Sequence, residues 1–100
     1  MIRYVFGTRV EADLREIRDH IAADSPDSAR RLMIRLVNAF RLLARRPDLG
    51  HVRDDLLEPS IRFWPVGAYL ILYRSPRTPI EIVAVLHGAR DVPAIVNRRT

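Results

Sequence analysis

Two apolar segments in the C-terminal third constrain the fold of this chain more than any other feature. Tyr69–Arg74 and residues 80–86 are both rich in β-branched and aromatic side chains, the composition of β-strands. Residues 75–79 between them contain serine and two prolines, which favour turns. The sequence therefore predicts two adjacent antiparallel strands, with four polar residues near the strand ends: Arg74, His87, Arg90 and Asp91.

The N-terminal region begins with a short β-prone segment and continues as a helix. Residues 2–6 are apolar and form the first predicted strand. Thr8, followed by Glu11 three residues later, predicts a capping box for a helix over residues 9–23. The buried stripe of this helix is predicted from apolar residues at helical spacing: Val10, Leu14, Ile17 and Ile21.

A second, longer helix is predicted to follow directly. Ser25 can cap its free amides, and Pro26 is tolerated in a first turn. Arg45 and Arg46 fall in the last turn, and Pro47 prevents continuation. The predicted buried face is wide and comprises Ala29, Leu32, Met33, Leu36, Val37, Phe40, Leu43 and Ala44.

The remaining segments complete the predicted topology. Residues 48–60 are polar and predict a loop, and residues 61–64 predict a strand that stops at Pro65. Asp91 can cap a short final helix over residues 92–97. The order β-α-α-β-β-β with a short C-terminal helix predicts a two-layer α+β fold, in which a helical hairpin packs on a mainly antiparallel sheet.

The two C-terminal strands are apolar on both alternating faces, so part of the second sheet face must also be covered. The terminal helix, a bound partner or both can supply that cover.

Composition narrows the class of protein. One hundred residues with 48% hydrophobic content suit a single domain over residues 1–100. No apolar run is long enough to span a bilayer and no secretory signal is present, so we expect a cytoplasmic protein without a membrane partner. All seventeen cations are arginine, and the net charge is +5. Arginine clamps anions but does not transfer protons, so acidic partners are favoured.

Few residues have the chemistry of a catalytic site. Cysteine is absent, and His20, His51 and His87 are not spaced as a metal-binding set, so no metal or cofactor is expected. One candidate cluster remains for a metal-independent ribonuclease, in which a histidine transfers protons and arginines neutralise phosphate: Arg62, Arg74, His87 and Arg90, with Arg53 as a further member.

Two members of this cluster also have a structural interpretation. We expect His87 to fix the strand-to-helix turn by a hydrogen bond with the backbone. The charge of Arg74 must reach solvent, a carboxylate or a partner, because an unpaired buried guanidinium is costly.

Several motifs, in order along nearly the whole chain, resemble the ParE/RelE superfamily of bacterial type II toxins, also called plasmid stabilisation toxins. The last strand ends in Val-Leu-His-Gly-Ala-Arg-Asp at residues 85–91. Ala-Asp-Leu-x-Glu-Ile stands at residues 12–17, and Pro-x-Leu-Gly at residues 47–50 follows Ala39-Phe40. Phe-x-Pro-Val-Gly occupies residues 63–67. Arg74, residues 85–88 and the lack of lysine look more like ParE than RelE.

The resemblance implies a toxin that stops growth by poisoning DNA gyrase without chemistry of its own. A short cognate antitoxin is the implied partner, and operator DNA is bound only through that antitoxin. A ribosome-dependent mRNA endonuclease of the RelE kind, with His87 and the surrounding arginines as active site, is the alternative. A detoxified or purely regulatory binding module is a third hypothesis.

Two sets of contact residues follow as predictions. The target-binding set is Arg53, Arg62, Arg74 and Arg90. The antitoxin-binding set is an outer strip of the second helix, together with the sheet edge: Arg31, Ile34, Arg35 and Leu42.

Overall fold

The computed structural model describes residues 3–75 and 78–100. Ile2 of the predicted first strand, and Pro76 and Arg77 of the predicted turn, lie outside the described residues. The elements in chain order are β1 (Tyr4–Phe6), α1 (Val10–Ala22), α2 (Pro26–Arg45), β2 (His51–Val52), β3 (Ile61–Val66), β4 (Tyr69–Arg74), β5 (Ile80–His87) and α3 (Val92–Arg99).

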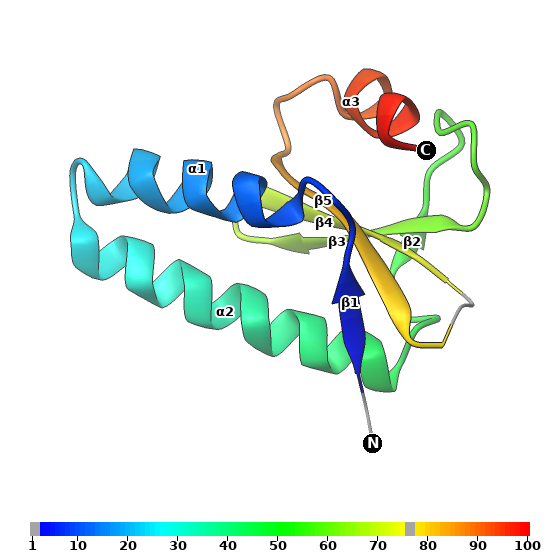
Figure 1. Ribbon diagram of the computed structural model, residues 1–100, viewed down its shortest axis with the longest axis horizontal. Coiled ribbons are helices and arrows are strands. Elements are labelled where there is room, and N and C mark those ends of the chain that lie inside the picture. Colours follow the sequence, from blue (N-terminus) through cyan, green and yellow to red (C-terminus); the bar gives the residue numbers. More distant parts are fainter. Residues whose placement is uncertain (1–2, 76–77) are drawn as a thin grey trace.

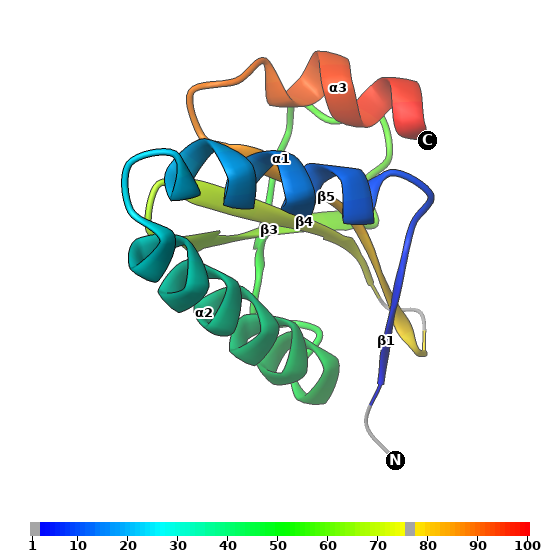
Figure 2. The same cartoon turned by 60° about the vertical axis from the view of Figure 1, so that its left-hand side comes forward.

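The strands form one five-stranded sheet in the order β1-β5-β4-β3-β2. β1 runs parallel to β5, and the other neighbouring strands are antiparallel. The α1–α2 hairpin packs on the core of one sheet face and α3 on the core of the opposite face, with α1 drawn between α2 and α3 (Figures 1 and 2). The predicted α+β architecture, a helical hairpin packed on a mainly antiparallel sheet, is therefore confirmed.

Each face of the sheet has its own apolar core. The helix core lies between the sheet and the α1–α2 hairpin, and its fully buried residues include Leu36, Phe40, Leu43 and Ile71. The α3 core lies on the other face and includes Leu72, Ala84, Val92 and Val96. Ile71 and Leu72 are neighbours on β4, both fully buried, and belong to opposite cores. The predicted cover of the second face by the terminal helix is confirmed.

The helix boundaries follow the capping signals at α2 and α3 but not at α1. The Ser25 Oγ accepts a hydrogen bond from the Ser28 amide at 3.2 Å, and the Asp91 carboxylate accepts one from the Ala94 amide. The predicted capping box at Thr8 is wrong, because the helix starts one residue later and its N-cap residue, Arg9, makes no side-chain cap.

The strand predictions need two corrections. Strand β2 lies within the segment predicted as a loop, because His51 and Val52 pair with Phe63 and Arg62. Strand β3 continues through Pro65 to Val66, and within the described residues Pro65 pairs with β4 alone. A proline is tolerated there because this stretch of β3 lies at the edge of the described sheet, beyond the short β2.

Tyr73 of β4 anchors the segment that follows α2. Its ring is fully buried, and its hydroxyl donates to the Pro47 carbonyl at 2.7 Å and accepts from the Gly50 amide at 2.8 Å. A Cβ on Gly50 would lie 2.4 Å from this hydroxyl, so only glycine fits. Burial raises the pKa of the Tyr73 phenol, opposed mainly by its hydrogen bond with Gly50.

Candidate functional site

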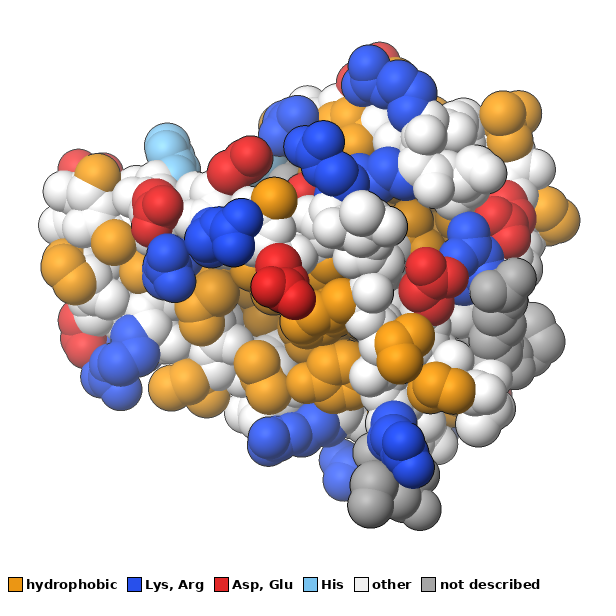
Figure 3. Space-filling view, in the orientation of Figure 1, with side chains coloured by type: hydrophobic (Ala, Val, Ile, Leu, Met, Phe, Trp, Pro, Cys, Tyr) orange, Lys and Arg blue, Asp and Glu red, His pale blue; other side chains and the backbone are white. Residues whose placement is uncertain are grey.

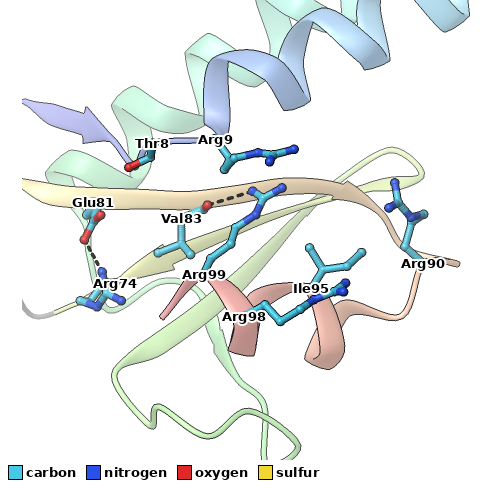
Figure 4. Close-up of a pocket in the computed structure, with 10 residues that line it drawn as sticks. Thr8, Arg9, Arg74, Glu81, Val83, Arg90, Ile95, Arg98 and Arg99 are labelled. Carbon is cyan, nitrogen blue, oxygen red and sulfur yellow. Dashed lines mark hydrogen bonds and ion pairs between the residues drawn. The ribbon is translucent and has the colours of Figure 1, made fainter.

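Arg74 is held between carboxylates at the end of β4. Its guanidinium donates two hydrogen bonds to Glu58, at 2.8 and 2.9 Å, and a further one to Glu81 of β5 (Figure 4). Only 11% of the side chain is exposed. The hydrogen bonds that Glu58 accepts are the main cause that raises the pKa of Arg74. The charge of Arg74 is therefore neutralised inside the molecule.

His87 lies at the last position of β5 and supports the turn toward α3. Its Nδ1 accepts a hydrogen bond from the Ala89 amide at 3.0 Å, as the structural interpretation of this residue predicts. Its ring packs edge-to-face against Tyr69, with the centroids 5.3 Å apart. One ring nitrogen is thus already occupied by the backbone.

The sheet register separates Arg74 from His87. Arg74 pairs with Glu81, and Tyr69, at the other end of β4, pairs with His87. At roughly 3.4 Å per residue the two ends of β4 are about 17 Å apart. Arg62 pairs with Tyr73, the neighbour of Arg74, and therefore points to the opposite sheet face. Arg62, Arg74 and His87 of the ribonuclease hypothesis therefore do not form one cluster.

Arg53 and Arg62 also make contacts within the chain. Arg53 donates to both carboxylate oxygens of Asp55, at 2.9 and 2.7 Å, and lies 5.8 Å from the centroid of the Phe63 ring. The hydrogen bond with Asp55 raises the pKa of Arg53 and lowers that of Asp55. Arg62 donates to the Gly50 carbonyl at 2.9 Å. Both arginines thus help to fix the segment around β2.

Arg90 differs from the other predicted target-binding arginines. It is exposed in the loop between β5 and α3, and its guanidinium has no ion-pair partner among the described residues. Its backbone amide donates to the His87 carbonyl, which fixes the loop but leaves the side chain available. Of the predicted set, Arg90 is best placed to contact another molecule.

An ion pair that was not predicted from the sequence links the first helix, α1, to the last, α3. Asp13 of α1 is buried, and Arg99 of α3 donates two hydrogen bonds to its carboxylate, at 2.6 and 2.7 Å. The same carboxylate accepts from the Val85 amide on β5, and Arg99 also donates to the Val83 carbonyl. The pair with Asp13 is the chief cause that raises the pKa of Arg99. The sequence did contain a signal for this ion pair, because Asp13 is an acidic residue within the apolar stripe of α1.

The predicted antitoxin strip lies on the outer side of α2. Ile34 is 50% exposed, and Leu42 is half-buried. Arg31 pairs with Asp27, and Arg35 extends toward the β3–β4 turn, where a Cβ on Gly67 would lie 3.5 Å from its Nη1. Figure 3 shows apolar side chains gathered between α1 and α2, with arginines beside them. Half-buried residues of α1 and α2 that pack against the helix core include Leu14, Ile21, Met33 and Val37.

Neither a metal site nor a membrane-spanning helix is found within residues 3–75 and 78–100. Histidine, aspartate and glutamate side chains there form no group of three that could hold a metal ion. No helix in the same part of the chain combines the length and apolar character needed to cross a bilayer.

Fold and composition together describe a small basic α+β protein. A family model described as the ParE toxin of the type II toxin–antitoxin system parDE matches residues 4–92. The chain belongs to this family of toxins, which implies an antitoxin as partner.

Individual relatives agree with this assignment. Toxin RelE2 of Caulobacter vibrioides is 34% identical over 90 residues, which cover 90% of this chain and 99% of the relative. Toxin ParE3 of the same organism is 31% identical over 98 residues, or 96% of this chain and 97% of the relative. A solved structure, the chromosomal ParDE system from P. aeruginosa, shares the fold with a TM-score of 0.70 and 20% identity, over 87% of this chain and 96% of that chain.

Proposed function

We propose that this toxin stops growth by binding and poisoning DNA gyrase, and that it catalyses no reaction of its own. The match of residues 4–92 to the ParE family is the observation that carries the proposal. The side-chain geometry supports it, because Arg74 is neutralised by Glu58 and Glu81, and His87 lies at the far end of the same strand pair. Arg74 is therefore too far from His87 to neutralise a phosphate on which that histidine acts, and the His87 Nδ1 already accepts from the Ala89 amide.

Arg90 is the proposed principal contact with the target, because the other three predicted arginines are engaged within the chain. Arg53, Arg62 and Arg74 are each bonded within the chain, whereas the Arg90 side chain has no such bond among the described residues. A free, exposed guanidinium can form a bidentate pair with a carboxylate or phosphate of the target.

Incubation of the purified toxin with gyrase, ATP and supercoiled plasmid tests the proposal. After detergent and protease treatment, linear DNA is expected, in an amount that rises with toxin concentration and falls when the cognate antitoxin is added first. A toxin preparation that arrests growth but yields no linear DNA would overturn the gyrase assignment.

His87→Gln separates a gyrase poison from an mRNA endonuclease. Growth arrest by this variant is expected to stay within about twofold of the wild type, since His87 serves the turn and not a reaction. An endonuclease that uses His87 as acid or base would lose about a hundredfold or more in rate. Circular dichroism of the variant confirms that the fold is retained.

The antitoxin is proposed to bind along the outer strip of α2 and at the edge strand β1. Ile34 supplies an exposed apolar side chain flanked by Arg31 and Arg35. At the sheet edge, Val5 and Phe6 are 46% and 37% exposed. An amphipathic segment with acidic margins would match this arrangement of apolar and basic residues.

Ile34→Asp tests this surface against a control elsewhere on the chain. The charge would face apolar antitoxin side chains, so affinity for the antitoxin encoded beside the toxin gene is expected to fall at least about tenfold, measured by calorimetry. Leu57→Asp is the control, because Leu57 is 81% exposed in the β2–β3 loop, outside the proposed surface. Equal losses in both variants would contradict the placement.

A further inference from the structure

A hollow of about 570 Å³ lies between the start of α1, strand β5 and helix α3, and arginines from several elements surround it. Figure 4 shows Arg9 before α1, Arg90 in the β5–α3 loop, and Arg98 and Arg99 on α3. Arg74 and Glu81 lie at one end (Figure 4). We call this the arginine hollow. Among the described residues, five arginines and one carboxylate line it.

Within the described part of the chain, three of the five guanidinium groups have no carboxylate partner. Arg74 is neutralised by Glu58 and Glu81, and Arg99 by Asp13. Arg9 and Arg90 make no side-chain hydrogen bond or ion pair with any described residue. The Arg98 guanidinium donates to the Ala94 carbonyl, which leaves its charge without an anion.

The three unpaired guanidinium groups come from separate segments of the chain and line one open space. Their like charges repel one another, and a bound anion would offset that repulsion.

We infer that the arginine hollow binds the phosphodiester backbone of a nucleic acid. Planar guanidinium forks bind phosphate oxygens bidentately. The backbone carries one such charge per nucleotide, which suits several arginines around one open hollow. The described residues that line the hollow include no aromatic side chain on which a base could stack. Contacts are therefore to the backbone and carry little sequence preference.

An acidic peptide is the competing ligand, and the lining favours it less. A bound peptide brings amide donors that need acceptors and side chains that need apolar anchors. Among the described residues around the hollow, only Val83 and Ile95 have large apolar side chains. The role of the site rests on the proposed function: a toxin bound to gyrase would also hold the DNA on which gyrase acts.

Oligonucleotide binding by the full chain tests the inference without gyrase. Fluorescence anisotropy with single-stranded DNA, duplex DNA and RNA of one sequence, over a range of salt concentrations, gives affinity and its salt dependence. The test variant is the triple substitution Arg9→Gln, Arg90→Gln and Arg98→Gln. The matched control is Arg15→Gln, Arg41→Gln and Arg45→Gln, which removes equal charge from exposed arginines outside the hollow.

The wild type and the control are expected to bind with similar slopes of log affinity against log salt. The test variant is expected to bind at least about tenfold more weakly at low salt. Its slope is expected to fall by roughly 2 to 3, at about 0.7 to 0.9 for each phosphate that the variant no longer neutralises. The nucleic acid bound most tightly identifies the source of the backbone.

Two results would overturn the inference. Equal losses of affinity in the test and control variants would mean that net charge alone attracts the oligonucleotide. Tighter binding of a poly-glutamate peptide of equal charge, abolished only in the test variant, would assign the hollow to an acidic peptide. If oligonucleotide binding behaves as expected while gyrase yields no linear DNA, the gyrase proposal fails and the nucleic-acid site stands.

Discussion

The two faces of the sheet are covered in different ways. On the face of the α1–α2 hairpin, two long amphipathic helices supply a broad apolar core. On the other face one short helix covers a smaller core, and ion pairs fix its surroundings: Arg99 with Asp13, and Arg74 with Glu58 and Glu81. The first face is stabilised by packing, whereas the second depends on charged contacts that leave its margin basic and open.

The sharpest test of this contrast uses two neighbouring residues. Ile71→Ala and Leu72→Ala each remove a fully buried aliphatic side chain from β4, one facing each core. We expect Ile71→Ala to cost about 4 kcal/mol of unfolding free energy and Leu72→Ala about 3 kcal/mol, because α3 can shift to reduce the cavity. Denaturant unfolding measures both costs. A larger loss in Leu72→Ala would contradict the contrast.

Asp13→Ala tests the charged connection between α1 and α3. It would leave Arg99 and the Val85 amide without the carboxylate, so a loss of about 3 kcal/mol in unfolding free energy is expected. In the Asp13→Ala variant, backbone amides of α3 should exchange hydrogen with solvent faster than those of α2. Arg15→Ala, on an exposed position of the same helix, is the control and is expected to change stability by less than about 0.5 kcal/mol. Equal effects would show that the pair contributes little.

Tyr73→Phe tests the polar contact inside the helix core. It would leave the buried Gly50 amide unpaired, at a cost of about 2 kcal/mol. The folded pKa of Tyr73 lies above its ordinary value of 10.0, so its contribution to stability is present below pH 10 and is lost as pH rises through the folded pKa. Unfolding at about pH 8 to 11 should show that decline in the wild type and a smaller one in Tyr73→Phe. Identical dependence of stability on pH in the two proteins would exclude a contribution from the Tyr73 phenol.

Asp91→Ala should have the smallest effect of the series. It removes the side-chain acceptor for the Ala94 amide at the start of α3, for an expected loss of about 1 kcal/mol. Asp91→Asn, which keeps a cap acceptor, should recover most of that loss. A variant with Asn as unstable as the one with Ala would indicate that the negative charge matters more than the cap.

Local patterns predicted most of the fold. The caps at Ser25 and Asp91 and the apolar spacing of α2 are encoded within a few residues, and those helices begin where predicted. β4 has the predicted bounds because its composition and flanking turns are equally local. The short β2 escaped prediction because it depends on pairing with β3, which lies about ten residues further along the chain.

The candidate site was less predictable, because its geometry depends on contacts between distant segments. Arg74 and Glu58 are 16 residues apart, and Asp13 and Arg99 are 86 apart, so no local pattern pairs them. The predicted antiparallel hairpin already implies that Arg74, beside the turn, and His87, at the far end of β5, lie at opposite ends, and the strand register agrees. The sequence could identify the arginines, but only the fold could separate the neutralised ones from those left free.

The proposal that this toxin poisons gyrase without chemistry of its own has one most direct test. Wild type and His87→Gln are compared side by side in the plasmid assay with gyrase and ATP, and in growth arrest. We predict similar amounts of linear DNA and similar arrest for both proteins. The proposal would be contradicted if the wild type arrested growth without producing linear DNA. The endonuclease alternative would then be supported if His87→Gln lost both growth arrest and mRNA cleavage.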